Sequence, residues 1–480
     1  MWQAVSSRSV SWVTESASTK PHRSTWPIMD VLPVADAKRV RRSLGAGSAD
    51  DEDLPGDRSV SATRIVIVGA GLAGVSAAFA LREAGFGGSI TLVGDEMHPP
   101  YHRPSLSKEY LRGEEGPADL FVEPPAAYAE RGIVWRSGEQ VVDVDAAGRT
   151  VLLGSGAALH YDRLLVATGA RPRALDVPGV ELPGVLQLRT IDDADRIAAA
   201  ATPGCRAVVV GMGFIGSEVA ASLRQRGAEV TAIEASQAPL GAVLGPEVGA
   251  VIADLHRERG VELLLGESVA AFEGSRRLER VRTAGGRVVA CDVAVVGIGV
   301  EPETGLLAAA GAATDRGVLV DALCRTSLPA IYAAGDVTDT EHAVFGRSHV
   351  EHWNNARQQG EAAARSMLGQ GRPYAYVHSF WSDQYDHSLE YVGLASGWDT
   401  LIFRGRPTSH RFLGFYLRQE RLLAVVGLDR GGDPEDRIRG SELKKCVPLI
   451  AAGARLDPTR LADETCLLKD TVVAATATSV

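Results

Sequence analysis

Two stretches of the chain decide the fold: RIVIVGAGLAG (residues 64–74) and AVVVGMGFIG (residues 207–216). Each is a short apolar run that ends in glycines with the spacing G-x-G-x-x-G, which are Gly69, Gly71 and Gly74 in the first and Gly211, Gly213 and Gly216 in the second. Apolar residues at helical spacing and a second apolar run follow each stretch. One such motif is weak evidence, but two complete units about 140 residues apart predict two Rossmann-like dinucleotide-binding domains.

These patterns also predict where the elements lie. We expect strands over 64–71 and 89–95 around a helix over 72–85, and strands over 205–213 and 228–234 around a helix over 214–227. The last hundred residues differ, because strand patterns over 391–395 and 411–428 precede a helical pattern over 443–454. The predicted fold is therefore α/β with two Rossmann-like domains and a C-terminal α+β domain.

The glycines have separate roles in binding a dinucleotide. One permits the tight turn, one lets the backbone approach a pyrophosphate, and one lets helix and strand pack closely, while the helix N-terminus offers free N–H groups to the phosphates. An acidic residue after the second strand then selects the nucleotide. Glu234 can accept hydrogen bonds from both ribose hydroxyls of NADH and would repel the 2′-phosphate of NADPH. In the first unit the matching position is Gly94 and the acids follow at Asp95 and Glu96, so we expect this contact there, from Asp95 in preference to Glu96.

Two dinucleotide sites in one chain imply an electron relay from a nicotinamide to a second, tightly held cofactor, which is usually FAD. The composition fits a globular protein of two or three domains, with 480 residues, 45% of them hydrophobic. A net charge of −10 argues against nucleic acid or an anionic membrane as partner. The five cysteines form no CxxC pair, which favours a reducing, cytoplasmic location and argues against a dithiol redox centre.

The domain division follows from these patterns. We expect a mostly disordered tail over residues 1–63, because it is rich in Ser, Arg and Ala and has no sustained period. The FAD-binding domain is expected to be discontinuous, over 64–173 and 298–374. The NAD-binding domain should cover 174–297, and the C-terminal reductase domain should cover 375–480.

Seven motifs in order make the chain resemble a known family. They are VGAGLAG (68–74), PPYHRPSLSK (99–108), YDRLLVATGARPR (161–173), VVGMGFIGSEVAA (209–221), IYAAGDVT (331–338), VEHWNNARQQGEAAARSMLG (350–369) and FWSDQYD (380–386). They resemble the FAD-dependent, NADH-utilising ferredoxin reductases of bacterial dioxygenase and haem-monooxygenase systems. These enzymes are related in fold to rubredoxin reductases and apoptosis-inducing factor, within the pyridine nucleotide-disulfide oxidoreductase-like fold.

The resemblance implies two sets of cofactor-binding residues. Asp336 is expected to accept a hydrogen bond from a ribityl hydroxyl, Arg171 to face the FAD diphosphate, and Trp353 to pack near the isoalloxazine. The full FAD set is Gly69, Gly71, Ala73, Gly74, Asp95, Arg103, Lys108, Val141, Thr168, Gly169, Arg171, Asp336 and Trp353. The NAD set is Gly211, Gly213, Ile215, Gly216, Glu218, Glu234 and Gly299.

The proline-rich stretch 99–108 ends in Lys108, which the resemblance places near flavin N5. An ammonium there would stabilise the negative charge that hydride transfer brings to the ring. A buried lysine without a partner tends to lose its proton, so we expect Lys108 to pair with Glu218 of the second domain. Lys108 and Glu218 are thus the candidate catalytic residues. The plain alternative is that Lys108 is a solvent-exposed residue at a helix start.

The implied function is a flavoprotein that takes two electrons from NADH as hydride and delivers them singly to a [2Fe–2S] ferredoxin, and through it to an oxygenase. A related reductase or oxidase with rubredoxin, a small molecule or oxygen as acceptor would keep every motif. A redox-sensing protein like apoptosis-inducing factor is a further alternative. A dithiol-disulfide reductase is disfavoured because it needs a cysteine pair beside the flavin. We expect no metal ligand set.

Overall fold

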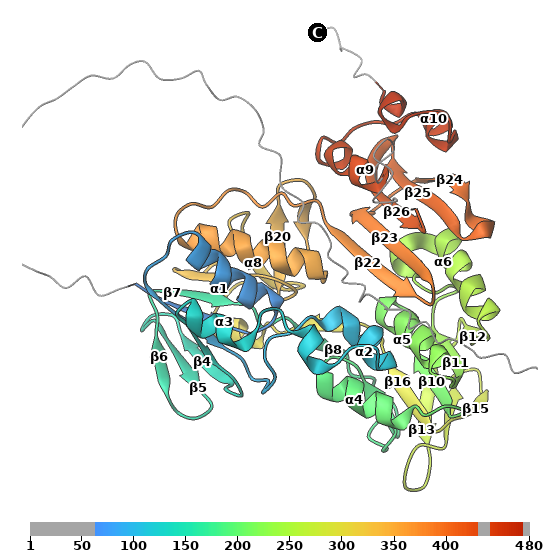
Figure 1. Ribbon diagram of the computed structural model, residues 1–480, viewed down its shortest axis with the longest axis horizontal. Coiled ribbons are helices and arrows are strands. Elements are labelled where there is room, and N and C mark those ends of the chain that lie inside the picture. The colour runs from blue at the N-terminus through green and yellow to red at the C-terminus, as the bar shows by residue number, and fades with distance from the viewer. Residues whose placement is uncertain (1–62, 431–441, 474–480) are drawn as a thin grey trace, which may run out of the picture. The chain divides into compact units, whose positions relative to one another are not determined.

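The computed structural model describes residues 63–430 and 442–473 (Figure 1). The tail predicted over residues 1–63 therefore lies outside the described residues, apart from Thr63. Within the described part, two parallel sheets and one antiparallel sheet form the framework.

The first parallel sheet is built around the first glycine motif. Its strand order is β19-β7-β1-β2-β3. The strands are β1 (Arg64–Val68), β2 (Ser89–Val93), β3 (Ile133–Arg136), β7 (Arg163–Val166) and β19 (Ile331–Ala333). Helices α1 (Leu72–Glu83) and α8 (Trp353–Met367) pack against each other beside this sheet. Since β19 and α8 come from far along the chain, the segment after the second unit returns to the first sheet.

The second parallel sheet repeats this arrangement around the second glycine motif. Its strand order is β12-β11-β10-β16-β9. The strands are β9 (Val185–Gln187), β10 (Arg206–Val210), β11 (Glu229–Glu234), β12 (Glu262–Leu265) and β16 (Val293–Val296), and the helices are α4 (Ile191–Ala200), α5 (Phe214–Gln225) and α6 (Gly241–Glu258). Strand β10 lies between β11 and β16 in parallel register, as a Rossmann-like unit requires.

The C-terminal part is a five-stranded antiparallel sheet followed by helices. Its strand order is β22-β23-β26-β25-β24, with β22 (Ser379–Gln384), β23 (His387–Gly393), β24 (Thr400–Arg406), β25 (Arg411–Arg418) and β26 (Arg421–Leu428). The helices are α9 (Glu442–Ala451) and α10 (Pro458–Ala462). The predicted fold, two parallel Rossmann-like sheets and a C-terminal α+β unit, is therefore confirmed.

Smaller elements join these three parts. Two three-stranded sheets have the orders β4-β5-β6 and β13-β14-β15, a third has the order β18-β20-β21, and β8 pairs with β17. The strand bounds are β4 (Val141–Asp145), β5 (Thr150–Leu153), β6 (Ala158–His160), β8 (Ala170–Pro172), β13 (Val269–Glu273), β14 (Arg280–Thr283), β15 (Val288–Ala290), β17 (Val300–Pro302), β18 (Val318–Val320), β20 (Thr338–His342) and β21 (Gly346–Ser348). Short helices are η1 (Arg103–Ser107), α2 (Glu109–Arg112), η2 (Pro117–Leu120), α3 (Pro125–Glu130), α7 (Gly305–Ala309), η3 (Pro407–Ser409) and η4 (Leu468–Thr471).

The strands before the glycine turns end earlier than the sequence predicts. Strand β1 stops at Val68 and β10 at Val210, where predictions reached residues 71 and 213. Gly69 and Gly211 have φ of +103° and +90°, a left-handed conformation that leaves the strand geometry. The turn therefore begins at the first glycine of each motif.

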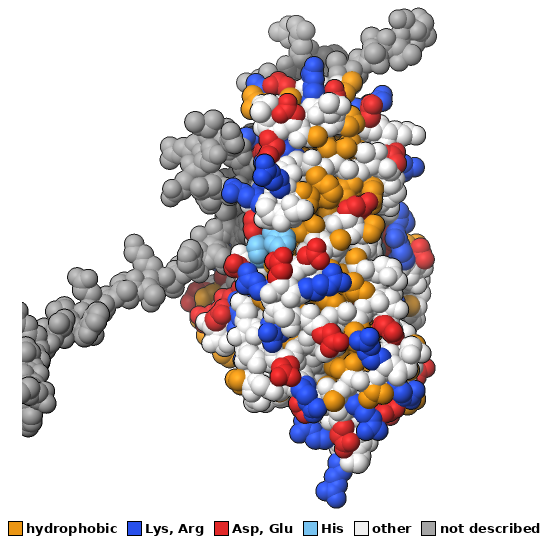
Figure 2. Space-filling model, turned by 90° about the vertical axis from the view of Figure 1, so that its right-hand side faces the viewer, with side chains coloured by type: hydrophobic (Ala, Val, Ile, Leu, Met, Phe, Trp, Pro, Cys, Tyr) orange, Lys and Arg blue, Asp and Glu red, His pale blue; other side chains and the backbone are white. Residues whose placement is uncertain are grey.

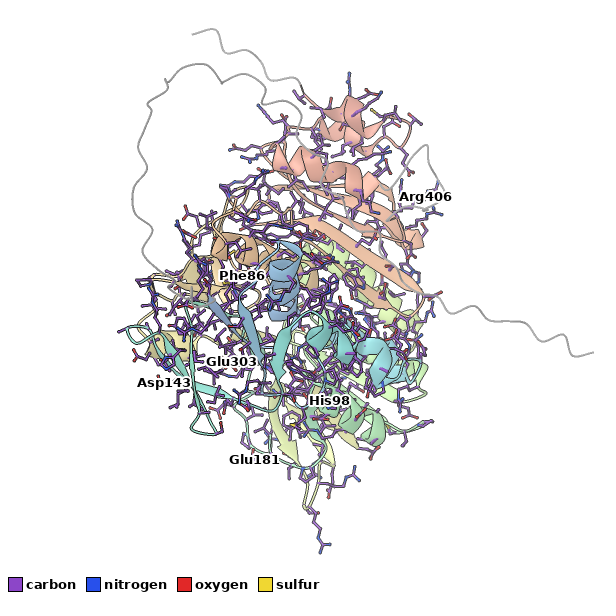
Figure 3. The ribbon with its side chains drawn as sticks, turned by 60° about the vertical axis from the view of Figure 1, so that its left-hand side comes forward. Phe86, His98, Asp143, Glu181, Glu303 and Arg406 are labelled. Atoms are coloured by element: carbon purple, nitrogen blue, oxygen red, sulfur yellow. The ribbon has the colours of Figure 1, made fainter. Side chains whose placement is uncertain are left out.

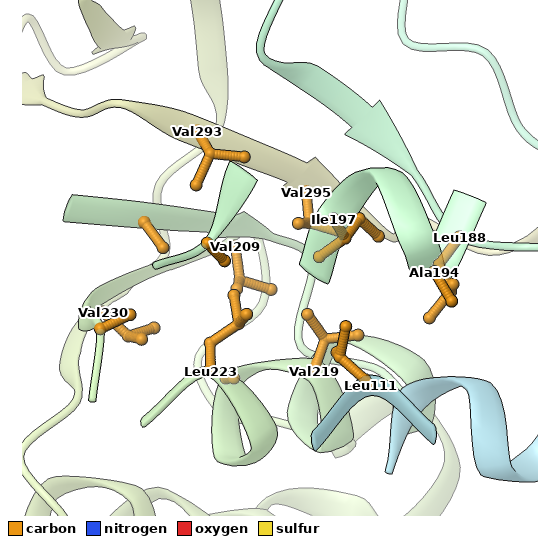
Figure 4. Close-up of a cluster of buried hydrophobic side chains, with 14 of the residues drawn as sticks. Leu111, Leu188, Ala194, Ile197, Val209, Val219, Leu223, Val230, Val293 and Val295 are labelled. Carbon is orange, nitrogen blue, oxygen red and sulfur yellow. The ribbon is translucent and has the colours of Figure 1, made fainter. Parts of the chain in front are cut away.

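A hydrophobic cluster ties helix α2 to the second parallel sheet (Figure 4). Leu111 of α2 is fully buried in this cluster with Val219 of α5 and Ile197 of α4. Because α2 begins directly after Lys108, this contact anchors the end of the proline-rich stretch 99–108 on the second unit.

The face shown in Figure 2 carries charged side chains of both signs. On the face in Figure 2, Lys and Arg side chains are interspersed with Asp and Glu rather than gathered into one large patch of a single sign. Nucleic-acid binding would need a concentrated basic surface. None of the helices within residues 63–430 and 442–473 has the length and apolarity of a membrane span.

Candidate active site

One cavity of about 300 Å³ lies where the N-terminal ends of α1 and α5 meet the proline-rich stretch 99–108. Most of the predicted site residues line it: Gly69, Gly71, Ala73, Asp95, Arg103, Lys108, Thr168, Gly169, Ile215, Glu218, Asp336 and Trp353. Residues from both glycine units thus face a single space. The cysteines lie outside this lining, and all five are free thiols.

The two glycine turns have the same geometry. A Cβ on Gly74 would lie 2.0 Å from the carbonyl oxygen of Gly69, so this position allows only glycine, whereas a Cβ on Gly71 would meet nothing within 4 Å. In the second turn a Cβ on Gly216 would lie 1.9 Å from Gly211 O, and Gly213 is again open. The closed positions let helix and strand pack closely, and the open ones leave the space that a pyrophosphate needs beside the backbone. Both turns therefore fit the dinucleotides that the sequence predicts.

The acidic residues of the two units lie at the strand ends, as expected. Asp95 is exposed at the cavity edge. Glu234 ends β11 against the second glycine turn, where its Oε2 accepts a hydrogen bond from the backbone N–H of Met212 at 2.6 Å and its Oε1 accepts one from Ser236 at 2.8 Å. A ribose beside this turn would meet a carboxylate already oriented by the backbone.

The proline-rich stretch 99–108 forms one wall of the cavity. Arg103 donates hydrogen bonds to Glu96 Oε1 at 2.5 Å and to the carbonyl oxygen of Arg189 at 2.6 Å. Trp353 Nε1 donates to Nδ1 of His102 at 3.1 Å, and burial lowers the pKa of His102, so its neutral ring can accept this bond. These contacts fix both the path of the stretch and the plane of Trp353.

Lys108 and Glu218 form the predicted pair. Lys108 Nζ lies 3.4 Å from Glu218 Oε2, and the two residues are only 3% and 6% exposed. The alternative of a solvent-exposed lysine is therefore wrong. Lys108 Nζ also lies 5.9 Å from the ring centroid of Trp381, close enough for a cation–π contact.

Two serines complete the surroundings of Glu218. Ser107 Oγ donates to Glu218 Oε2 at 2.5 Å, and Ser382 Oγ of β22 donates to Oε1 at 2.8 Å. Burial raises the pKa of Glu218, whereas Lys108 and both hydroxyls oppose that rise. Glu218 is thus a buried carboxylate that receives hydrogen bonds from two different parts of the chain, the stretch before α2 and the C-terminal sheet.

Asp336 lies in the cavity beside an arginine that sequence reasoning missed. Arg189 Nη2 is 3.5 Å from Asp336 Oδ2. Burial raises the pKa of Asp336, and Arg189 opposes this. Arg189 follows β9 in the second unit, and only the packing of the two units brings it to a residue of the first. A basic residue at the carboxyl end of a strand is the one signal that could have identified it.

Eight of the predicted cofactor residues do not line the cavity: Gly74, Gly211, Gly213, Gly216 and Glu234 of the two glycine units, and Val141, Arg171 and Gly299. Arg171 is exposed and pairs with Glu301 at 2.7 Å and Glu303 at 2.8 Å, so the expected diphosphate contact is replaced by a surface ion-pair cluster (Glu303 is labelled in Figure 3). Val141 is half-buried in β4 and packs against the hydrophobic cluster between the first sheet and β5. Gly299, with φ of +98°, shapes the turn after β16.

Other residues of the lining were also missed. His98 follows β2 (it is labelled in Figure 3), and its Nε2 lies 2.9 Å from Asp192 of α4. His352 is half-buried in the lining, and its buried Nδ1 has no hydrogen-bond partner among the described residues. A buried polar atom in this position fits a cavity that binds a polar ligand.

Comparisons with known proteins agree with this geometry. The model of the pyridine nucleotide-disulphide oxidoreductase family matches residues 63–360, and a model described as reductase C-terminal matches residues 379–472. A probable ferredoxin reductase from Castellaniella defragrans is 41% identical over 369 residues, which are 76% of this chain and 90% of that protein. The ferredoxin–NAD(+) reductase subunit of a benzene 1,2-dioxygenase system from Pseudomonas putida is 35% identical over 86% of this chain and 98% of that protein.

Solved structures agree as well. One match is a chain in the covalent complex of putidaredoxin reductase with putidaredoxin. That chain is 36% identical to this protein and superposes on it with a TM-score of 0.81, and the match covers 85% of this chain and 98% of the chain in the complex. The ferredoxin reductase for the CYP199A2 system from Rhodopseudomonas palustris has a TM-score of 0.80 and 35% identity, over 85% of this chain and 100% of that one.

Proposed function

The chain belongs to the pyridine nucleotide-disulphide oxidoreductase family, and we propose that it is an FAD-dependent ferredoxin–NAD(+) reductase. The observation that carries the proposal is the single cavity lined by both dinucleotide units, with the buried Lys108–Glu218 pair inside it. Bound FAD would take two electrons as hydride from NADH and release them one at a time.

The chain's own residues would hold and orient the two nucleotides. The open sides of Gly71 and Gly213 admit the pyrophosphates, and the N-termini of α1 and α5 supply N–H groups and a favourable dipole. Asp336 would accept a hydrogen bond from a ribityl hydroxyl, and Trp353 would pack against the ring system. Arg189, which lies beside Asp336, would be a basic group of the cavity together with Arg103 and Lys108, whereas Arg171 is exposed outside it.

Lys108 would place a fixed positive charge where reduction makes the cavity more negative. A preorganised charge in a water-poor site stabilises developing charge more strongly than one in solvent. Glu218 holds the ammonium in place, because the two oppositely charged groups are buried together 3.4 Å apart. No protein nucleophile is needed in this scheme.

The preferred donor would be NADH. The Glu234 carboxylate stands at the ribose position of the second unit, and the following residues ASQAP contain no arginine that could receive a 2′-phosphate. The electron acceptor would be a [2Fe–2S] ferredoxin, and through it an oxygenase in the cytoplasm. The relatives support this, because their names describe ferredoxin reductases of oxygenase systems.

A spectroscopic experiment tests this proposal. The purified protein, supplemented with FAD, should be yellow, and its flavin absorbance should bleach with NADH at much lower concentrations than with NADPH. Turnover with NADH should be faster with a [2Fe–2S] ferredoxin than with rubredoxin, a quinone or oxygen. A colourless protein after FAD supplementation would contradict the cofactor, and a preference for a small acceptor would contradict the partner.

A further inference from the structure

Glu218 is the point where three parts of the chain meet. The residue itself belongs to α5 of the second unit, Ser107 and Lys108 come from the end of the stretch 99–108, and Ser382 comes from β22 of the C-terminal sheet. Ser382 is fully buried. It is the one residue of the C-terminal sheet that the structure records donating a hydrogen bond to Glu218.

The hydrogen bonds around Ser382 fix the direction of its hydroxyl. A serine hydroxyl has one hydrogen to donate and two lone pairs to accept with. Gln384 Nε2 donates to Ser382 Oγ at 3.3 Å, so one lone pair is engaged and the hydrogen remains available for Glu218 Oε1 at 2.8 Å. Gln384 is buried too, and it lies on the same face of β22, two residues further along.

The two oxygens of Glu218 are therefore held separately. Ser107 and Lys108 contact Oε2, and Ser382 alone contacts Oε1. Without Ser382, Oε1 would lose its recorded donor in a buried site, where a charged oxygen without hydrogen bonds is strongly disfavoured. The carboxyl group could then rotate or take up a proton, and either change would weaken its attraction for Lys108.

We propose that Ser382 is a positioning residue for the active-site pair: its hydroxyl aims the Glu218 carboxylate at Lys108 and keeps that carboxylate charged. The C-terminal sheet thereby takes part in setting the charge state of the active site. The kinetic part of this inference rests on the proposed function, whereas the part that concerns Glu218 does not.

The electrostatic surroundings of Glu218 agree with this role. Burial is the largest influence on its pKa and raises it, while Lys108, Ser107 and Ser382 act in the opposite direction. Asp383, the neighbour of Ser382 on β22, also raises this pKa. Loss of Ser382 would leave burial and Asp383 opposed only by Lys108 and Ser107, so the protonated form of Glu218 would extend to higher pH.

The test is an infrared pH titration of the FAD-loaded protein labelled with ¹³C-glutamate, in which Glu218→Gln identifies the Glu218 band. In Ser382→Ala, the midpoint for protonation of Glu218 should rise by about one pH unit, as expected for one lost hydrogen bond to a charged group. Ser382→Thr, which keeps a hydroxyl, should restore the midpoint. Ser379→Ala serves as the matched control, because Ser379 lies on the same strand but contacts Asn354 and Tyr376.

A kinetic titration provides the second measurement. In Ser382→Ala, the rate of flavin reduction by NADH should fall at a higher pH than in wild type, by the same shift as the infrared midpoint, while the rate at high pH stays close to wild type. An unshifted infrared midpoint in Ser382→Ala would overturn the inference, as would an equal shift in Ser379→Ala. If the infrared midpoint shifts but the reduction rate does not, Ser382 still positions Glu218, and the role of the pair in the proposed function is wrong.

Discussion

Lys108 and Glu218 are 110 residues apart in the sequence, yet each is nearly inaccessible to solvent and each is the other's charged partner. Burying two charges costs several kcal/mol per ion unless hydrogen bonds and attraction offset it. The pair is thus poorly explained by a contribution to stability. Stabilisation of negative charge in an active site explains its presence better.

Replacing Lys108 with methionine tests that reason. Lys108→Met should retain FAD, because the phosphate-binding turns are untouched, but should slow flavin reduction by NADH about 100-fold, the usual effect of removing one preorganised charge donor. Rapid mixing under anaerobic conditions measures this rate. Lys469→Met, at an exposed lysine of η4, is the control. Equal reduction rates in Lys108→Met and wild type would remove Lys108 from the mechanism.

Glu234 allows a second prediction at this scale. Glu234→Gln keeps the size of the side chain but removes the charge that would repel a 2′-phosphate. We expect kcat/KM for NADH to fall about 10-fold and kcat/KM for NADPH to stay level or rise, so that the preference narrows. Steady-state kinetics with both nucleotides measure the ratio. An unchanged ratio would mean that another residue selects the nucleotide.

At the scale of elements, the same strand–glycine turn–helix unit occurs twice. In each unit one glycine is needed for the close packing of helix and strand, and another leaves space for a ligand. Gly74 is closed by the Gly69 carbonyl, whereas Gly71 faces open space with an extended backbone at φ −75° that any residue can adopt. The two positions therefore separate folding from cofactor binding.

Alanine at each position should have a different effect. Gly74→Ala should lower the unfolding free energy of the FAD-free protein by about 1–3 kcal/mol, the usual cost of overpacking. Gly71→Ala should leave that free energy nearly unchanged but weaken FAD binding, because the added methyl group enters the space for the pyrophosphate. Urea unfolding and an FAD fluorescence titration make the two measurements. If Gly71→Ala binds FAD as tightly as wild type, Gly71 does not border the space for the pyrophosphate.

Local pattern was sufficient for these elements but not for every side chain. The glycine spacing predicted both dinucleotide-binding units. The family motifs predicted the pairing of Lys108 with Glu218, because the chemistry of the site needs these residue types at these positions. Arg171 was misjudged because its direction depends on Glu301 of β17 and on Glu303 just after that strand, which attract it to the surface. Arg189 and Ser382 were missed because only the packing of distant segments brings Arg189 to the cavity and Ser382 to Glu218.

At the scale of the whole molecule, the resemblance to ferredoxin reductases stated from the sequence is confirmed by the matching families and by structures at TM-scores of 0.81 and 0.80. The domain limits at residues 173, 297 and 374 stay a prediction. The fully buried His256 of α6 lies against the C-terminal part, where its Nδ1 is 3.0 Å from Tyr385 Oη.

His256 gives a prediction for the stability of the whole molecule. Burial lowers the pKa of His256 to about 4, whereas an unfolded histidine titrates at about 6.5. The unfolded chain therefore binds more protons between these values, and the unfolding free energy falls as the pH drops through this window. Between pH 7 and pH 5, proton uptake by His256 in the unfolded chain lowers the unfolding free energy by about 2 kcal/mol.

His256→Gln removes this proton uptake. The loss of unfolding free energy between pH 7 and pH 5 should be about 2 kcal/mol smaller in the variant than in wild type. Urea unfolding at the two pH values makes the comparison, and parallel losses in both proteins would refute the assignment.

Electron delivery is the central claim, and one anaerobic measurement tests it most directly. The FAD-loaded protein is mixed with a limiting amount of NADH and an excess of oxidised [2Fe–2S] ferredoxin, and the absorbance of both proteins is followed. The account predicts that about two ferredoxins are reduced for each NADH, because one hydride carries two electrons and a ferredoxin accepts one. Flavin that bleaches with NADH while the ferredoxin stays oxidised would contradict it.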